Sequence, residues 1–254
     1  MLTAITRRVS PSINKCELTH LKRQPIDFEI ASNQHEKYEN ILRSLGVKVI
    51  SLSAEADLPD SVFVEDAAIV LDEVAVITRP GADSRKSETA GIANALSPFR
   101  KLEYIQAPAT LDGGDVLVIG KTIYMGISSR SNPPAMEQMQ TKLSPYGYTV
   151  KGVEISGCLH LKSAVTRVVE QTLLINPEWV NRKNFPGMAF IEIDPAEPQS
   201  ANALLIGQSV LYPSAFPKTR TRLEEAGICL ITMDVSEIAK AEGALTCCSL
   251  IFKT

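Results

Sequence analysis

The chain has 254 residues, of which 44% are hydrophobic and 22% charged, and its formal net charge at pH 7 is −3. These values exclude a disordered or low-complexity chain and leave enough apolar side chains for a core. Such a chain lacks the basic surface that phosphate backbones require, so no nucleic-acid partner is expected. No uncharged apolar run reaches membrane-spanning length, and the start does not resemble a secretory leader. We therefore expect a cytoplasmic protein with no membrane partner.

The five cysteines lack the spacing of a disulfide framework or of a zinc site. None belongs to a CxxC pair, and only three histidines accompany them. A metal centre is therefore not expected. A lone cysteine is most often a small buried apolar residue, so a catalytic cysteine has to be supported by its context.

The first predicted elements are a strand, a helix and a second strand. Residues 3–9 and 47–53 are apolar and β-rich, while residues 28–45 carry apolar side chains at helical spacing and stop at Gly46. After this opening, the pattern becomes a hairpin, a helix and a strand.

Four predicted β-hairpins follow, each made of two short apolar runs across a two-residue turn. They span residues 67–78, 116–127, 163–176 and 202–213. The first, second and fourth are followed by predicted helices at residues 87–96, 133–143 and 218–227, whereas residues 178–185 after the third have only a weak helical pattern. Each of these segments leads into a β-rich run, at residues 101–107, 148–155, 188–193 and 228–235.

These elements form five strand–strand–helix–strand units of about 40–50 residues, a period typical of propellers and solenoids. The fifth hairpin is split between the two ends of the chain, at residues 246–252 and 3–9. Pairing of these terminal strands would close a ring and remove its exposed sheet edges. We therefore predict one domain over residues 1–254, an α/β fold that is a five-bladed α/β-propeller with pseudo-fivefold symmetry. An ordinary α+β sandwich with coincidental hairpins is the alternative.

The segments that precede the hairpins occupy the same place in every unit, so they should converge on the central axis. Four of them carry chemically unusual residues, in PDSVFVED, LDGGDVL, GCLHLKS and GALTCCS, and the fifth, PQSAN, is merely polar. Convergence would bring a cysteine, a histidine and several carboxylates together from distant parts of the chain.

Three of these segments offer the groups of a nucleophilic site. His160 suits a general acid/base, Asp112 or Asp115 can orient the imidazole, and one of the thiols of Cys247 and Cys248 can attack. We expect the two cysteines on the last strand, where neighbouring side chains point to opposite faces. The alternatives are core cysteines, an ordinary loop histidine and a glycine-rich turn.

The remaining polar residues describe a ligand. Asp60, Glu65 and Asp66 crowd an apolar run with no cation nearby in sequence, so they either face water or await a cationic ligand. Arg85 and Arg130 follow their hairpins at equivalent places and suit a bidentate grip on a carboxylate, unless they are solvated surface residues. An amino acid that bears a guanidinium fits this set.

Five stretches, VFVEDAAIV, RPGADSRKSE, LDGGDVL, HLK and TCCSL, together resemble the dimethylarginine dimethylaminohydrolases across essentially the whole chain. The resemblance implies the five-bladed α/β-propeller of the guanidino-group-modifying superfamily. It also implies hydrolysis of N-omega-methylated arginine to citrulline and dimethylamine or methylamine through a covalent cysteine thiouronium intermediate. The substrate is then a small molecule, no organic cofactor or metal is needed, and the protein is a monomer or a homodimer.

The same resemblance implies roles for individual residues. Cys247 would be the nucleophile, His160 the general acid/base and Asp112 the orienting carboxylate, a position at which some relatives have Glu; Cys248 would belong to the core. The implied substrate contacts are Glu65 and Asp66 for the guanidinium, Asp60 with the backbone carbonyls near Leu18 and Ala241 for the α-amino group, and Arg85 and Arg130 for the α-carboxylate.

Two other functions remain as alternatives. One is arginine deiminase or another guanidino hydrolase of the superfamily, although those chains are usually longer. The other is a non-catalytic amino-acid-binding protein on the same fold. Residues 14–27, which are polar, are a candidate lid over the site.

Overall fold

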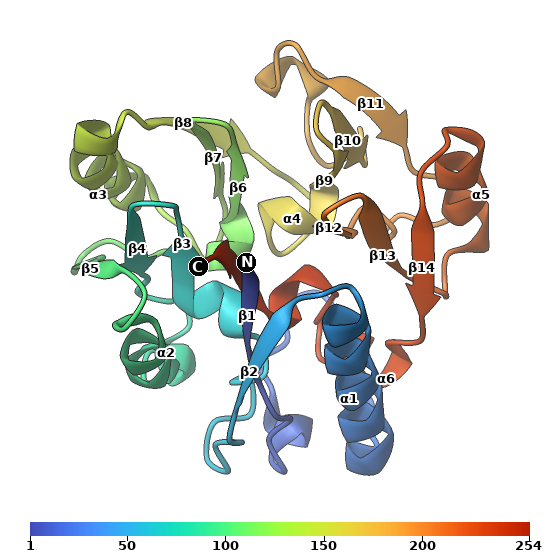
Figure 1. Cartoon of the computed structure of the whole chain (residues 1–254), viewed down its shortest axis with the longest axis horizontal. Coiled ribbons are helices and arrows are strands. Elements are labelled where there is room, and N and C mark those ends of the chain that lie inside the picture. Colours follow the sequence, from blue (N-terminus) through green and yellow to red (C-terminus); the bar gives the residue numbers. More distant parts are fainter.

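A computed structural model describes residues 1–254, and its strands form five separate three-stranded sheets that surround a common centre (Figure 1). Each sheet joins an antiparallel hairpin to a third, parallel strand, in the order that the repeat predicts. The architecture is therefore the predicted five-bladed α/β-propeller. None of its helices combines the length and the apolar character needed to cross a membrane.

The hairpin's first strand lies nearest the centre in every sheet, and the parallel strand lies outermost (Figure 1). The sheet that contains both chain ends consists of β15 (Leu250–Lys253), β1 (Leu2–Arg7) and β2 (Lys48–Leu52). The other sheets are β3 (Ala68–Val70), β4 (Val74–Ile77) and β5 (Lys101–Tyr104); β6 (Val116–Ile119), β7 (Thr122–Ile127) and β8 (Thr149–Glu154); β9 (Val165–Val169), β10 (Thr172–Ile175) and β11 (Ala189–Glu192); and β12 (Leu204–Ile206), β13 (Ser209–Pro213) and β14 (Leu230–Met233).

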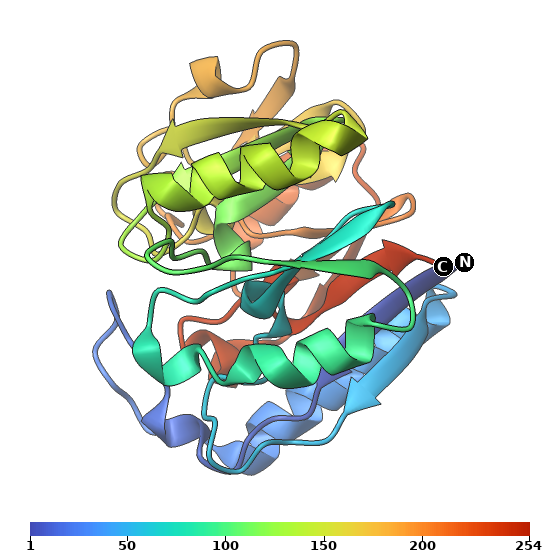
Figure 2. The same cartoon turned by 90° about the vertical axis from the view of Figure 1, so that its left-hand side faces the viewer.

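The chain ends close the ring as predicted. Strand β1 pairs antiparallel with β15, with Leu2 opposite Lys253 and Ile5 opposite Leu250, and pairs parallel with β2 on its other side. The N-terminal amine donates a hydrogen bond to the carbonyl of Thr254 at 2.9 Å, and both ends lie side by side in Figures 1 and 2.

Four longer helices lie outside the sheets, and two of them, α2 and α3, face the viewer in Figure 2. They are α1 (Phe28–Ser44), α2 (Glu88–Leu96), α3 (Pro133–Leu143) and α5 (Pro217–Glu225), with two short helices, α4 (Leu161–Ala164) and α6 (Ser236–Ala239). Local signals set their ends: the Asp27 carboxylate caps α1 by accepting the Ile30 N–H, and Pro133 begins α3 where its missing N–H costs nothing. The weakly helical segment in the third unit forms only a 3₁₀ turn at Arg182–Asn184.

Apolar clusters fill the interfaces between neighbouring sheets. Successive residues of a middle strand point to opposite faces, so Leu173 and Ile175 pack towards the sheet before theirs, and Leu174 packs towards the sheet after it. Because both faces are covered, these strands are almost continuously hydrophobic, which explains the apolar runs in the sequence.

Short turns precede the innermost strands and lie beside the centre of the ring. They include 3₁₀ turns at Val64–Ala67, Gly113–Asp115 and Thr246–Cys248, together with helix α4. The prediction that Cys247 and Cys248 lie on a strand is therefore wrong, because β15 begins only at Leu250. Side chains in a 3₁₀ turn are about 120° apart, so the two neighbouring thiols still point in different directions.

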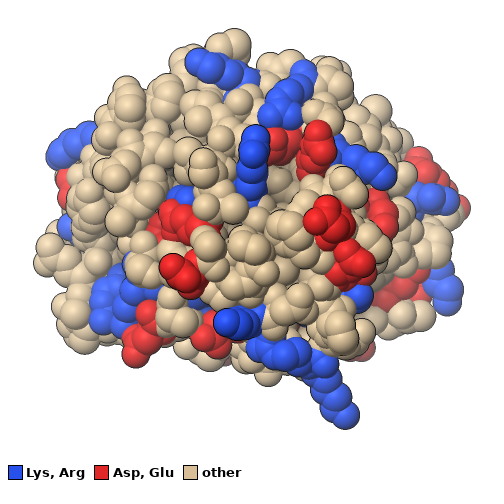
Figure 3. All heavy atoms as spheres, turned by 90° about the horizontal axis from the view of Figure 1, so that it is seen from below, with Lys and Arg blue, Asp and Glu red and all other residues tan.

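Charged side chains of both signs are interspersed on the face shown in Figure 3, which views the molecule from below. That face presents no extended patch of a single charge.

Candidate active site

A cavity beside the inner turns brings together residues from distant parts of the chain. Its lining comprises Glu17, Asp60, Phe63, Asp66, Arg85, Arg130, Leu159, His160, Ala241, Glu242, Gly243 and Cys247. Most of the residues that the sequence predicts for the site belong to this lining. Asp112, Glu65 and Leu18 lie outside this lining. Asp112 contacts His160, which lines the cavity, and Glu65 contacts Thr246, which directly precedes Cys247.

His160 precedes α4 and is held between two carboxylates. Its Nε2 lies 3.0 Å from Oδ2 of Asp112, and its Nδ1 lies 3.9 Å from Oδ1 of Asp66. Burial alone would lower the pKa of the imidazole, but the charge of Asp66 and the hydrogen bond to Asp112 raise it to about 9. His160 is thus poised to carry a proton at neutral pH.

Asp112 is fully buried, and a backbone N–H group holds one of its carboxylate oxygens. Its Oδ1 accepts the N–H of Gly81 at 2.8 Å, which leaves Oδ2 for the imidazole of His160. The Arg130 guanidinium lies 4.0 Å from the same Oδ2. This hydrogen bond restrains the His160 imidazole, an arrangement suited to the third group of a nucleophile–base–acid set.

Cys247 lies on the inner 3₁₀ turn next to Thr246, whose contacts hold that turn. The Thr246 N–H donates to the Asn202 amide oxygen at 3.2 Å, and its hydroxyl donates to Oε2 of Glu65 at 2.8 Å. Burial, with the negative charges of Glu65 and Asp66, raises the pKa of the Cys247 thiol well above its ordinary value. The resting thiol is therefore protonated, and a nearby positive charge is needed to form the thiolate.

Glu65 does not line the cavity, because both of its oxygens are engaged next to the cysteine turn. One oxygen pairs with the Lys162 ammonium and the other accepts the Thr246 hydroxyl. Burial raises the pKa of this carboxyl, while the charge of Lys162 opposes that shift.

Arg85 is buried and surrounded by carboxylates. Its Nη1 donates to Asp66 at 2.6 Å, its Nη2 donates to Glu88 at 2.8 Å, and the Phe63 carbonyl accepts a further bond at 3.2 Å. Burial would raise the pKa of Asp66, but the charges of His160 and Arg85 lower it to about 2. Asp66 thus stays ionised in the cavity wall, with Arg85 behind it.

The candidate lid, residues 14–27, contacts residues that line the cavity. The Glu17 N–H donates to Asp60 at 3.1 Å, and Nη2 of Arg130 donates to the Thr19 hydroxyl at 3.1 Å. Leu18, between these contacts, packs against the adjacent core, while Ala241 is buried in the cavity wall.

The glycines of LDGGDVL are required by close packing around the imidazole. A Cβ at Gly114 would lie 2.6 Å from Nδ1 of His160 and 2.9 Å from Oδ1 of Asp66, and one at Gly113 would lie 2.0 Å from the Glu65 carbonyl oxygen. No larger residue fits without moving the site.

Asp66, Asp112 and His160 also present ligand atoms within 4.8 Å of one another, the spacing of a small metal site. Their mutual contacts account for this spacing as an acid–imidazole network.

With this geometry established, the chain can be compared with known proteins. Residues 7–185 match the family described as N,N dimethylarginine dimethylhydrolase, eukaryotic. The N(G),N(G)-dimethylarginine dimethylaminohydrolase of Streptomyces coelicolor is 37% identical over 97% of this chain and 95% of its own length. This chain belongs to the dimethylarginine dimethylaminohydrolase family.

Solved structures give the same family. The dimethylarginine dimethylaminohydrolase of Pseudomonas aeruginosa, as a cysteine-to-serine mutant complexed with citrulline, matches with a TM-score of 0.94, 33% identity and 98% coverage of both chains. The N-terminal domain of a cyanobacterial arginine dihydrolase matches with a TM-score of 0.85 over 98% of this chain and 97% of that one. At 17% identity, this second likeness shows the fold alone.

For this member of the dimethylarginine dimethylaminohydrolase family, sequence reasoning missed several residues around the cavity. Glu88 begins α2 and follows Arg85 by three residues. Side chains at this spacing pair on helical turns, so the contact between Arg85 and Glu88 could have been predicted from the sequence. Lys162 directly follows Leu161 in sequence, and Thr246 directly precedes Cys247. Both contact Glu65, which lies in a distant segment. Only the closed ring reveals these contacts.

Proposed function

We propose that this protein hydrolyses N-omega-methylated arginine, such as asymmetric dimethylarginine or monomethylarginine, to citrulline and dimethylamine or methylamine. The observation that carries the proposal is the cavity that combines the Cys247 thiol, the His160–Asp112 pair and the Asp66 carboxylate. The names of the bacterial relatives and the citrulline bound in the Pseudomonas aeruginosa structure support the same reaction.

Binding places a guanidinium beside Asp66, and Glu65 joins it by releasing Lys162 or the Thr246 hydroxyl. Asp60 and the carbonyls of Leu18 and Ala241 take the α-amino group. Arg85 and Arg130 take the α-carboxylate, and Arg85 exchanges its contact with Asp66 or Glu88 to do so. Because Arg85 and Asp66 are direct neighbours, Asp60 and Arg130 beside the candidate lid set the orientation of the substrate. Orientation of this kind lowers the barrier by several kcal/mol, on the order of the effect measured in intramolecular reactions.

Burial and the charges of Glu65 and Asp66 raise the pKa of the Cys247 thiol and keep it protonated, and the arriving cation offsets those charges. Cys247 then loses its proton to solvent, and the thiolate attacks the guanidinium carbon to form a tetrahedral adduct. The protonated His160 donates its proton to the departing dimethylamine as the C–N bond breaks. A covalent thiouronium remains on Cys247.

The second half of the reaction uses the neutral imidazole. His160 takes a proton from a water molecule, and the resulting hydroxide attacks the thiouronium carbon. The C–S bond breaks, the hydroxyl proton of the adduct passes to the departing sulfur and restores the Cys247 thiol, and citrulline is released. Asp112 keeps the imidazole in one orientation during both proton transfers. The chain's own residues supply every group, so no metal or organic cofactor is needed.

An arginine deiminase activity is the alternative, because only the leaving amine differs between arginine and its methylated forms. Turnover of asymmetric dimethylarginine, arginine and agmatine is measured side by side. We expect asymmetric dimethylarginine to have the highest kcat/KM. Faster turnover of arginine or agmatine contradicts the proposed substrate, and turnover of none of them favours the non-catalytic binding protein.

The five sheets share one centre, which supports treating residues 1–254 as a single catalytic domain. All five cysteines are unpaired, which agrees with a reducing cytoplasmic location. We propose that the working form is a monomer or a homodimer, since each chain carries the complete set of site residues.

A further inference from the structure

Glu242 has an unusual backbone for its residue type. Its φ of 56° lies in the left-handed region, and it is the only residue other than glycine with a positive φ. Glutamate is strained in this conformation, which glycine adopts freely. Strain of this kind persists where the surrounding contacts require the side chain.

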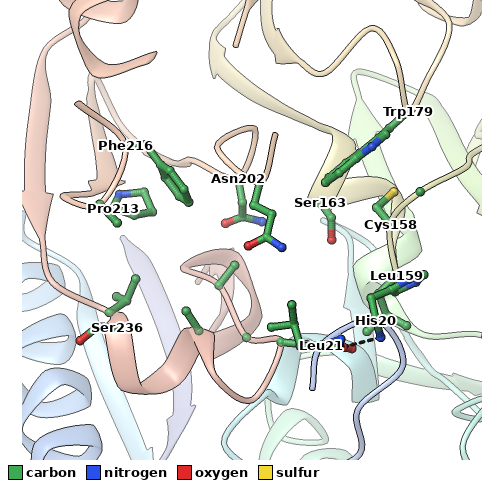
Figure 4. Close-up of a pocket in the computed structure, with 18 residues that line it drawn as sticks. His20, Leu21, Cys158, Leu159, Ser163, Trp179, Asn202, Pro213, Phe216 and Ser236 are labelled. Carbon is green, nitrogen blue, oxygen red and sulfur yellow. Dashed lines mark hydrogen bonds between the residues drawn. The ribbon is translucent and has the colours of Figure 1, made fainter. Parts of the chain in front are cut away.

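The Glu242 carboxylate accepts three successive backbone N–H groups from the candidate lid. These are the N–H groups of Thr19 at 3.0 Å, His20 at 2.5 Å and Leu21 at 2.6 Å. A dashed line beside His20 and Leu21 in Figure 4 marks part of this contact. Hydrogen bonds to a charged acceptor are about twice as strong as those between neutral groups.

The base of the lid is separately tied, and its tip is held by Glu242 together with the hydrogen bond from Arg130 to the Thr19 hydroxyl. The Asn14 side chain exchanges two hydrogen bonds of 2.8 Å with the backbone of Ile26, and Arg23 donates to the carbonyls of Asn14 and Cys16 at 2.6 Å. These contacts make residues 14–26 a closed loop. Between its base and its tip lies Leu18.

Glu242 also stands between two cavities. It lines the active-site cavity and a neighbouring cavity, which Trp179 and Phe216 flank in Figure 4. Glu242 directly follows Ala241 in sequence, and Thr19, the first residue whose N–H group it accepts, directly follows Leu18. Ala241 and Leu18 are the two residues whose carbonyls are assigned to the substrate's α-amino group.

We propose that Glu242 is a positioning residue that fastens the lid tip and thereby sets the Leu18 and Ala241 carbonyls around the α-amino group. The proposal rests on the proposed function for the identity of the substrate. The Glu242 carboxylate is occupied by the three N–H groups of the lid, so it acts through the lid and affects ground-state and transition-state binding alike. Its loss should raise KM and leave kcat largely unchanged.

Two variants test this role. Glu242→Gln keeps the size of the side chain but replaces the charged acceptor, and Glu242→Gly removes the side chain while relieving the strained φ. The matched control is Glu225→Gln, an exposed glutamate at the end of α5. For each protein we measure the kinetics with asymmetric dimethylarginine and the hydrogen exchange of the Thr19, His20 and Leu21 amides.

We expect both Glu242 variants to raise KM about tenfold with kcat within about twofold, since they lose uniform binding. Exchange at the three amides should accelerate about tenfold without substrate, whereas the control should match the wild type. Unchanged exchange, or a wild-type KM in the glycine variant, overturns the proposal. Because the exchange measurement needs no turnover, it decides the role of Glu242 even if asymmetric dimethylarginine is not the substrate.

Discussion

Arg85 and Arg130 follow their hairpins at equivalent places, but their surroundings in the structure differ. Arg85 is clamped between Asp66 and Glu88, and burial raises the pKa of Glu88 to about 7 against the opposing charge of Arg85. The Arg130 guanidinium makes a single hydrogen bond, to the Thr19 hydroxyl, and a longer contact with Asp112. Arg85 therefore has a structural role that Arg130 lacks.

This difference predicts separate outcomes for the two alanine variants. Arg85→Ala should lower the free energy of unfolding by about 3–5 kcal/mol, because it leaves buried carboxylates without their cation. Arg130→Ala should change that free energy by no more than about 1 kcal/mol and mainly raise KM. Urea unfolding and steady-state kinetics measure both effects. Equal losses of stability, or an unchanged KM in Arg130→Ala, would contradict this assignment.

The sequence predicts those site residues whose own segment carries an unusual reactive or charged side chain. Cys247, His160 and Asp66 meet in or beside one cavity because the repeat places their segments in phase. The partners of Glu65 could not be predicted in this way. Lys162 and Thr246 reach it from two other units, and nothing in its own segment indicates that both of its oxygens are engaged.

At the scale of elements, the inner turns position the site, and each is tied to a neighbour by a side-chain hydrogen bond. Asp66 accepts the Gly114 N–H, Asp115 accepts the Leu161 N–H, and Asn202 accepts the Thr246 N–H. The turn that carries Cys247 has a second tie through the Thr246 hydroxyl. A change in these ties should move catalytic groups without removing any of them.

Thr246→Val removes the hydroxyl and keeps the shape of the side chain. The buried Glu65 carboxylate then loses a hydrogen-bond donor, Nδ2 of Asn202 loses an acceptor, and the cysteine turn loses a constraint. We expect kcat to fall about tenfold with KM within about twofold, because misplacement of a reacting atom acts on the chemical step. Thr221→Val, on the exposed face of α5, is the control. A wild-type kcat in Thr246→Val would show that the tie has no catalytic importance.

At the scale of the whole molecule, the fold was largely predictable because five repeats carry the same pattern of hairpin and strand. The exceptions have local causes. The third unit lacks an outer helix, as its weak pattern indicated, and the cysteine segment forms a turn because it occupies the inner-turn position of its unit. Strand alternation is therefore the wrong basis for choosing between the two thiols.

Ring closure makes a circular permutant feasible. A short linker joins Thr254 to Met1, and the new ends are placed between Gly207 and Gln208, in the exposed turn of the β12–β13 hairpin. We expect this protein to fold, with a Tm within a few degrees of the wild type and full activity, because no strand pairing is broken. Deletion of residues 250–254 removes β15 and should prevent folding. An unfolded permutant would contradict the closure of the ring.

The central claim is that Cys247 forms a covalent bond with the substrate carbon. Mass spectrometry of protein quenched during turnover of asymmetric dimethylarginine tests it most directly, with Cys247→Ser and Cys248→Ser measured in parallel. Cys248 is buried in the core, so its variant should still turn over and still form the thiouronium adduct. We predict an adduct in the wild type and in Cys248→Ser, and neither adduct nor turnover in Cys247→Ser. An adduct that persists in Cys247→Ser, or disappears only in Cys248→Ser, would contradict the account.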